Sequence, residues 1–264
     1  MPVITTPEGE IEVLEWGEGE EVWLLLHAAA AGPNSLSGLA RALAAPGRHF
    51  VAPALAGYGA TRVGDRDDRM AMHVGVARAV FDRYPARRRV VFGHSMGGLV
   101  AVLAALPADA LVVHEPIVVG LLRDEDAGDV AARDWDRAIV ADLARAIAAG
   151  DAEPGLRGFV EAWNELAWDR LPASVRQRLL AAAPSLLADI QAGSFRTLDP
   201  SLVAPPPLIL QGGRSPTITA RMTARLHAGV PGSRRVVLEG CGHMAPVQAP
   251  EAVAAAIRAA GIAD

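Results

Sequence analysis

The stretch Val90-Val91-Phe92-Gly93-His94-Ser95-Met96-Gly97-Gly98-Leu99 places a glycine-flanked serine directly after an apolar run. The run 90–92 is typical of a buried strand, and the apolar residues from Met96 to Leu106 are typical of a helix. A serine at a sharp strand-to-helix turn has strained backbone geometry, and bulky neighbours would clash there. The start of the helix also presents N–H groups where a negative charge can develop. The pattern therefore predicts a nucleophile elbow with Ser95 as the nucleophile.

Similar apolar runs on both sides of this turn alternate with helical patterns. Strands are expected at 22–26, 50–52, 90–92, 111–113, 208–210 and 236–238, with a further edge strand at 11–14. Helices are expected at 36–43, 69–84, 96–106, 218–228 and 250–260. Strands separated by helices favour an α/β fold with a mostly parallel, doubly wound sheet.

Residues 121–201 interrupt this alternation, because they contain no convincing strand pattern. Helices are expected there at 131–149, 156–168, 173–183 and 186–192, separated by glycine and proline residues. An all-helical segment between two sheet strands is best interpreted as an inserted cap. The expected organisation is therefore a core made of residues 1–120 and 202–264, with a helical cap over residues 121–201.

The composition excludes several classes of protein and mechanism. The chain has 264 residues, 51% of them hydrophobic, which suits one large domain with a sizeable core. Its net charge of −5 argues against nucleic acid as a partner. All 25 basic residues are Arg, so a lysine Schiff base, a P-loop lysine and a Ser–Lys dyad are excluded. One cysteine, Cys241, rules out an internal disulfide or a cysteine-rich metal site.

The sequence shows no targeting or membrane-spanning signal. The first residues include acidic side chains and no long apolar run, so no signal peptide is expected. The longest apolar stretches are too short to cross a bilayer. A cytoplasmic protein without membrane contact is therefore expected, and monomer and homodimer both stay open.

His243 is the candidate general base, because a serine hydroxyl is a weak nucleophile until a neighbouring base takes its proton. It lies in Gly240-Cys241-Gly242-His243-Met244-Ala245-Pro246, a loop after the last expected strand. Such a loop can place its histidine over the sheet edge where Ser95 is expected. Cys241 is expected to be a small buried filler.

Three further segments carry a family resemblance. Leu26-His27 resembles a His-Gly oxyanion motif, residues 53–61 (PALAGYGAT) resemble a P-D-x-x-G-x-G-x-S segment, and residues 211–216 (QGGRSP) resemble a G-x-x-D-P segment. With the serine turn, they make the chain similar to the α/β-hydrolase fold family over nearly its whole length. The resemblance implies ester-type hydrolysis by residues in the chain order Ser…acid…His.

The chain departs from the family pattern at three positions. Ala28 replaces the usual glycine after His27, and Ala54 replaces the usual aspartate before the second segment's glycines. Most importantly, Ser215 stands where the family usually places its catalytic acid. A neutral hydroxyl cannot stabilise an imidazolium by charge.

Glu115 is the expected substitute for the missing acid. It follows the strand after Ser95, and some members of the family, including haloalkane dehalogenases, carry their acid at the end of that strand. It also preserves the order Ser95…Glu115…His243. The competing interpretation is a partly buried Glu115 paired with an arginine, and Asp124 and Asp199 are weaker candidates because they lie in cap or linker sequence.

The resemblance also implies the remaining site residues. The oxyanion hole is expected to use the backbone N–H of Met96 and that of Ala29, with Ala28 and Ala30 as alternatives for the second donor. The substrate pocket is expected to include His27, Ala28, His94, Phe159, Trp163 and Met244. The aromatic residues of the cap belong either to its core or to this pocket: Trp135, Phe159, Trp163, Trp168 and Phe195.

No metal ion or cofactor is expected. His114 and Glu115 are adjacent in a strand pattern, so their side chains should point to opposite faces, and no third ligand has suitable spacing. The chemistry is assigned instead to the serine and its two partners.

Three functions are compatible with these residues. The first is a serine hydrolase that cleaves a small to medium apolar carboxylic ester, lactone or thioester through an acyl-enzyme on Ser95. The second is a carbon–carbon bond hydrolase of the meta-cleavage type, which uses the same fold and triad. The third is a capped small-molecule-binding protein with little turnover, supported only by Ser215 at the usual acid position. In each case the expected partner is a small molecule.

Overall fold

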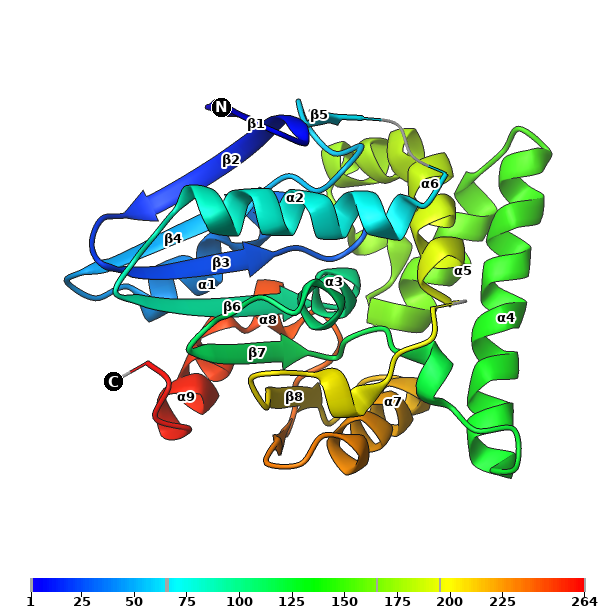
Figure 1. The fold of residues 1–264 in the computed structure, drawn as a ribbon. Coiled ribbons are helices and arrows are strands. Elements are labelled where there is room, and N and C mark those ends of the chain that lie inside the picture. The colour runs from blue at the N-terminus through cyan, green and yellow to red at the C-terminus, as the bar shows by residue number, and fades with distance from the viewer. Residues whose placement is uncertain (1, 65–66, 165, 195, 264) are drawn as a thin grey trace.

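The computed structural model describes residues 2–64, 67–164, 166–194 and 196–263, and it contains one large twisted sheet (Figure 1). The order of the strands is β1-β2-β4-β3-β6-β7-β8-β9, with β5 paired to β2. The strands are β1 (Val3–Thr6), β2 (Gly9–Gly17), β3 (Glu21–Leu26), β4 (Arg48–Pro53), β5 (Arg62–Val63), β6 (Arg88–His94), β7 (Ala110–His114), β8 (Leu208–Gly212) and β9 (Arg234–Leu238).

All pairings from β4 across to β9 are parallel, whereas β2 pairs antiparallel with β1, β4 and β5. This confirms the predicted mostly parallel fold. The expectation that residues 11–14 form an edge strand is wrong, since β2 pairs with β1 along its first half and with β4 along its second half. The short strand β1, which carries the outer position, was not predicted.

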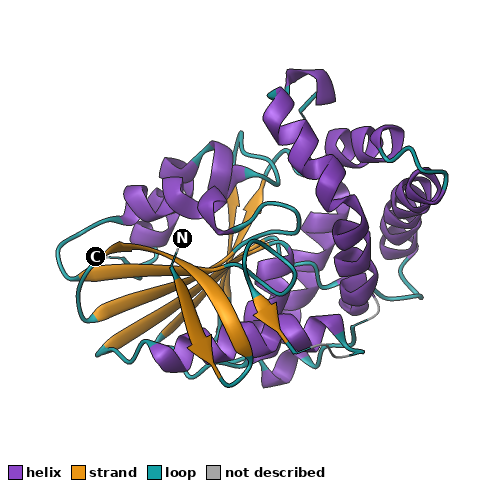
Figure 2. Ribbon diagram, turned by 90° about the horizontal axis from the view of Figure 1, so that it is seen from above, coloured by secondary structure: helices purple, strands orange, loops and turns teal. Residues whose placement is uncertain are grey.

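Helices cover both faces of the sheet (Figure 2). They are α1 (Ser37–Leu43), α2 (Arg69–Arg83), α3 (Met96–Ala104), α4 (Ala127–Ala148), α5 (Glu153–Asn164), α6 (Ala173–Ser194), α7 (Thr217–Gly229), α8 (Ala245–Gln248) and α9 (Pro250–Ala259), with 3-10 turns η1 (Pro33–Leu36), η2 (Val119–Leu121), η3 (Trp168–Arg170) and η4 (Pro200–Leu202).

The two-residue period of the strands divides the core between these helix layers. Leu24 and Leu26 of β3 pack in one cluster with residues of α2, α3 and α7. Trp23 and Leu25 of the same strand pack in a second cluster with residues of α1 and α9, and Cys241 is buried there as expected. Because neighbouring residues of a strand point to opposite faces, a strand buried on both faces must be apolar throughout.

The described residues between β7 and β8 contain helices and no strand. We call residues 119–202 the helical insert; α4, α5 and α6 lie beyond the carboxyl ends of β3, β6 and β7 (Figure 1). The insert has its own small core, which includes Leu143, Leu156, Trp168 and Leu186.

One prediction for the insert is wrong. Two helices were expected at 173–183 and 186–192, but α6 continues through Pro184. Proline removes one backbone hydrogen bond and crowds the preceding turn. Ala183 and Leu186 on either side of it are buried in the core of the insert, and this packing supports a continuous helix. Phe195 lies outside the described residues.

None of the helices in the described part of the chain is both long enough and apolar enough to span a membrane.

Candidate active site

Ser95 occupies the sharp turn between β6 and α3 with a φ of 56°, a conformation that is costly for a residue with a side chain. Its N–H donates to the His114 carbonyl at 3.0 Å, which fixes the turn against β7. A Cβ on Gly93 would lie 2.4 Å from the Gly97 carbonyl oxygen, and one on Gly97 would lie 2.2 Å from that of Leu26. Both glycines are therefore required by close backbone approach.

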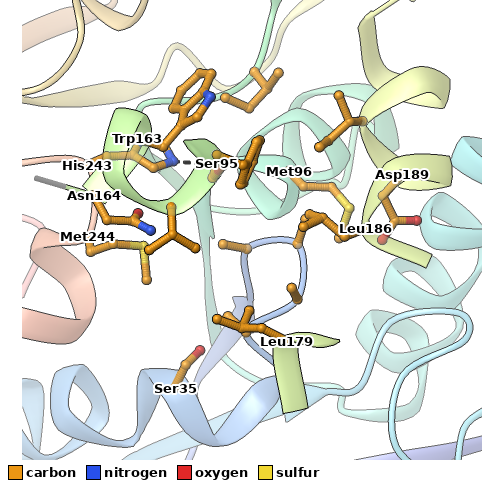
Figure 3. A pocket seen from close by; sticks show the side chains of 18 of the residues that line it. Ser35, Ser95, Met96, Trp163, Asn164, Leu179, Leu186, Asp189, His243 and Met244 are labelled. Atoms are coloured by element: carbon orange, nitrogen blue, oxygen red, sulfur yellow. Dashed lines mark hydrogen bonds between the residues drawn. The ribbon is translucent and has the colours of Figure 1, made fainter. Parts of the chain in front are cut away.

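The structure brings Ser95, His243 and Glu115 into one hydrogen-bonded chain. His243 Nε2 is 3.0 Å from Ser95 Oγ, and His243 Nδ1 is 2.6 Å from Glu115 Oε2 (the contact of Ser95 and His243 is dashed in Figure 3). The backbone N–H of Gly212 donates to Glu115 Oε1 at 2.8 Å. The three residues follow β6, β7 and β9, whose carboxyl ends share one sheet edge because the strands are parallel.

Glu115 is held in its ionised form. Burial alone would raise the pKa of its carboxyl, but the hydrogen bond and charge of His243, together with His114 and the nearby Ser215 hydroxyl, keep that pKa below its ordinary value. An ionised Glu115 accepts a hydrogen bond from His243 Nδ1–H, so Nε2 is left as an acceptor toward Ser95 Oγ. This arrangement can take a proton from a serine hydroxyl.

Two histidines expected in the pocket lie behind its wall instead. His27 Nε2 accepts the N–H of Leu55 at 3.1 Å, so Nδ1 carries the proton and donates to the Ala28 carbonyl at 2.8 Å. Burial lowers the pKa of His27 to about 4, which keeps it neutral. The Nε2 contact joins the loop after β3 to the loop after β4, and both ring nitrogens are engaged, so the assignment of His27 to substrate binding is corrected.

His94 is corrected for the same reason. It is completely buried, and its Nε2–H donates to the backbone carbonyl of His243 at 2.8 Å. Burial, reinforced by the neighbouring His243 and His114, holds the pKa of His94 well below its usual range. A neutral His94 therefore positions the loop that carries His243, and the side chain does not reach the pocket.

A cavity of about 520 Å³ opens above Ser95, between the sheet edge and the helical insert (Figure 3). The expected pocket residues Ala28, Phe159, Trp163 and Met244 line it. The ring of Trp163 lies 5.0 Å from that of His243 and 5.8 Å from that of Trp135, centroid to centroid. Trp168, by contrast, belongs to the core of the insert.

The expected oxyanion donors also lie on this wall. Met96 begins α3 directly after Ser95, and Ala29 lines the cavity beside it. The N–H of Ala30 donates to the Tyr58 hydroxyl at 2.9 Å, so this alternative donor is already engaged. Of the three alanines considered, this leaves Ala29 and Ala28 as candidates for the second donor.

Comparison with known proteins decides the family. Residues 23–256 match the Alpha/beta hydrolase family. The chain belongs to this family. The match spans most of the chain and includes Ser95, Glu115 and His243. It makes the protein a hydrolase.

Several solved structures share the fold at low identity, and no curated protein sequence matches the chain. The esterase EaEST of Exiguobacterium antarcticum has a TM-score of 0.75 and 18% identity, covering 98% of each chain. MenH of S. aureus has a TM-score of 0.73 and 18% identity, covering 94% of this chain and 96% of its own. A serine hydrolase of carbazole degradation, CarC, has a TM-score of 0.70 and 18% identity, covering 98% and 96%.

Sequence reasoning missed a buried polar network that ties the helical insert of this hydrolase to its core. Asp189 of α6 is buried and accepts hydrogen bonds from the Tyr58 hydroxyl, from Arg69 Nε and, at 3.0 Å, from His73 Nε2. Tyr58 in turn accepts the Ala30 N–H, so the network reaches the loop beside Ser95. The glycine-rich segment around Tyr58 was the available signal, but nothing in the sequence indicates its distant partner.

Replacing Asp189 with Asn is expected to destabilise the hydrolase by about 3 kcal/mol, because buried partners of the carboxylate lose their countercharge. Burial alone would raise the pKa of Asp189. The hydrogen bonds from His73, Arg69 and Tyr58, together with the charge of His73, outweigh the effect of burial and keep that pKa below its ordinary value. The stabilisation by the Asp189 charge is therefore fully present at pH values above the ordinary carboxyl pKa, and it is lost as the pH falls through the lowered pKa of Asp189. Urea unfolding of both proteins between neutral and acidic pH should show their difference shrinking on acidification. A constant difference would contradict the role of the charge.

Asp136 of α4 is a second carboxyl that sequence reasoning missed. It lines the cavity and is 6% exposed, and burial raises its pKa to about 6. A raised carboxyl pKa means that the folded protein is destabilised once the group ionises, so the cost is present above about pH 6 and vanishes below about pH 4.

Asp136→Asn is therefore expected to gain stability relative to the wild type as the pH rises through this window, by roughly 3 kcal/mol at full ionisation. The pH dependence of urea unfolding of both proteins measures it. The exposed Asp134 on the same helix supplies the control, since Asp134→Asn should show no such dependence. Parallel curves for the wild type and Asp136→Asn would contradict the expectation.

Proposed function

We propose that this hydrolase cleaves a small to medium, largely apolar carboxylic ester, lactone or thioester through an acyl-enzyme on Ser95. The observation that carries the proposal is the hydrogen-bonded chain from Ser95 Oγ through His243 to Glu115, which opens onto the cavity. Its volume of about 520 Å³ lies within the range of small-molecule pockets. Most lining side chains are apolar, which suits an apolar acyl or alcohol group.

In the first half of the reaction, Ser95 Oγ attacks the carbonyl carbon while His243 Nε2 takes its proton. The negative charge that develops on the carbonyl oxygen is stabilised by the backbone N–H groups of Met96 and Ala29. Glu115, ionised and hydrogen-bonded to Nδ1, stabilises the imidazolium that forms. His243 then donates the proton to the leaving alcohol or thiol, and the acyl group stays on Ser95.

In the second half, a water molecule takes the place of the leaving group. His243 Nε2 removes a proton from the water as it attacks the acyl carbon, and the same two N–H groups stabilise the second tetrahedral intermediate. Breakdown of this intermediate returns the proton to Ser95 Oγ and releases the carboxylic acid. We propose that the helical insert acts as the cap of this reaction chamber, because Phe159, Trp163 and Leu186 cover the cavity from that side.

A fluorophosphonate probe and a p-nitrophenyl ester test the proposal together. The probe should attach to Ser95 and abolish turnover of the ester, because phosphonylation of the serine blocks acyl-enzyme formation. Peptide mapping of the labelled protein identifies the modified residue. A protein that neither reacts with the probe nor turns over esters of any chain length would instead be a capped binding protein.

A further inference from the structure

The inner face of α4 carries acidic residues where a helix packed on a core normally has apolar ones. Its buried residues are Asp129, Ala132, Asp136 and Leu143, spaced by three, four and seven positions along one stripe. Asp129 is compensated, since Arg221 Nη1 and Arg225 Nε lie 2.8 and 2.7 Å from its carboxylate. An acidic residue on an apolar stripe breaks the local pattern, and such exceptions concentrate at functional sites.

Asp136 has no such compensation. Within residues 2–64, 67–164, 166–194 and 196–263, no hydrogen bond or ion pair engages its carboxyl group. Its neighbour Arg137 is 66% exposed and forms a long, 3.5 Å contact with Asp134 instead. Asp189, the other carboxyl on the cavity wall, is occupied by Tyr58 and two basic side chains. Of the two carboxyls that the described residues place on the cavity wall, Asp136 is therefore the one with open acceptor positions.

Trp163 and the next residue, Asn164, also line the cavity. The indole Nε1 of Trp163 is buried without a hydrogen-bond partner among the described residues. Trp163 packs between Trp135, which precedes Asp136, and His243. In mostly apolar surroundings, the cavity wall thus offers the carboxylate of Asp136 as a strong acceptor and the amide of Asn164, which can donate. A hydroxyl group can both donate and accept, whereas an ammonium group can only donate.

We propose that Asp136 binds a hydroxyl group of the substrate, so that the preferred substrate is a hydroxylated ester, lactone or thioester whose hydroxyl lies away from the scissile carbonyl. The inference rests on the proposed function and names its substrate class. A plain aliphatic substrate leaves a buried carboxylate without a partner, which penalises its binding. A site with such a polar group selects strongly against analogues that lack the matching hydroxyl.

Paired substrates test the proposal. Each pair is a p-nitrophenyl ester of a straight-chain acid and its ω-hydroxy analogue, over chain lengths from hexanoate to octanoate, because shorter hydroxy esters cyclise to lactones without enzyme. The readout is the ratio of kcat/KM for the hydroxylated ester to kcat/KM for the plain one. A hydrogen bond to a charged group contributes about 1.5–3 kcal/mol, so the ratio in the wild type should reach about 10–100 at the chain length that spans the pocket.

Variants locate the source of this preference. In Asp136→Leu the ratio should fall to about one, and because it is a ratio, any general loss of active protein cancels. Asp136→Asn keeps one acceptor and provides a polar second variant, with an intermediate ratio expected. Asp134→Asn is the matched control. It removes a carboxylate that is two residues from Asp136 and 61% exposed, and it should retain the wild-type ratio.

Three results would overturn the assignment. They are a wild-type ratio near one at every chain length, a preference that persists in Asp136→Leu, or a stronger preference for the ω-amino ester than for the ω-hydroxy ester. These failures differ from a failure of the proposed function, because plain esters would still be hydrolysed and Ser95→Ala would still abolish that hydrolysis.

Discussion

Ser95→Ala is expected to lower kcat for ester hydrolysis by roughly 10⁴- to 10⁶-fold, with the fold retained. The substitution removes the nucleophilic Oγ and leaves His243 Nε2 without its partner at 3.0 Å. Residual turnover should come only from the cavity and its backbone N–H groups acting on water. Steady-state kinetics with a p-nitrophenyl ester measures the loss.

Measurements of stability distinguish loss of the nucleophile from loss of the fold in Ser95→Ala. The turn still forces a positive φ on alanine at this position, so the backbone strain is the same as with serine and the fold should change little. Urea unfolding and circular dichroism of Ser95→Ala should therefore match the wild type closely. Retention of most esterase activity by a folded Ser95→Ala protein would show that Ser95 is not the nucleophile.

Glu115→Gln is expected to lower kcat by about 10²- to 10⁴-fold, again with the fold retained. The glutamine amide keeps the size of the side chain and can still accept the Gly212 N–H, but it carries no charge. It can no longer stabilise the imidazolium of His243, and it does not enforce the tautomer that leaves Nε2 free to accept a proton. Inside a buried site this loss of charge has a large effect on the transition state.

Two further variants separate the role of Glu115 from a structural one. Ser215→Ala should keep nearly wild-type activity, because the Ser215 hydroxyl makes only a minor contribution to holding the pKa of Glu115 low. The double variant Glu115→Gln with Ser215→Asp places a carboxylate at the position the family usually uses, and it should recover part of the lost kcat. Wild-type activity in Glu115→Gln alone would show that Glu115 is not the acid.

Much of the architecture follows from the sequence because the determining interactions are local. Gly93 and Gly97 have to be glycine whatever the rest of the chain does, since backbone carbonyls approach within 2.4 Å of where a Cβ would lie. Apolar strands separated by amphipathic helices can bury their side chains only in a doubly wound sheet. Parallel strands then bring the residues that follow them to one edge, which is why Ser95, Glu115 and His243 could be named together.

The tertiary structure decided the features that depend on distant partners. His27 and His94 appear in sequence as polar groups beside the site, but buried backbone groups of Leu55, Ala28 and His243 engage their nitrogens. Pro184 is a local signal for the end of a helix, yet packing within the helical insert outweighs it.

The same distinction separates the acidic residues of the helical insert. Asp129, Asp136 and Asp189 are alike in sequence, as acidic residues within helical patterns. Asp129 meets two arginines of α7, and Asp189 meets three side chains of the core. Asp136 faces the cavity with its acceptor positions open. Their environments differ because the insert folds back over the sheet, and contacts between residues so far apart along the chain leave no periodic trace in the sequence.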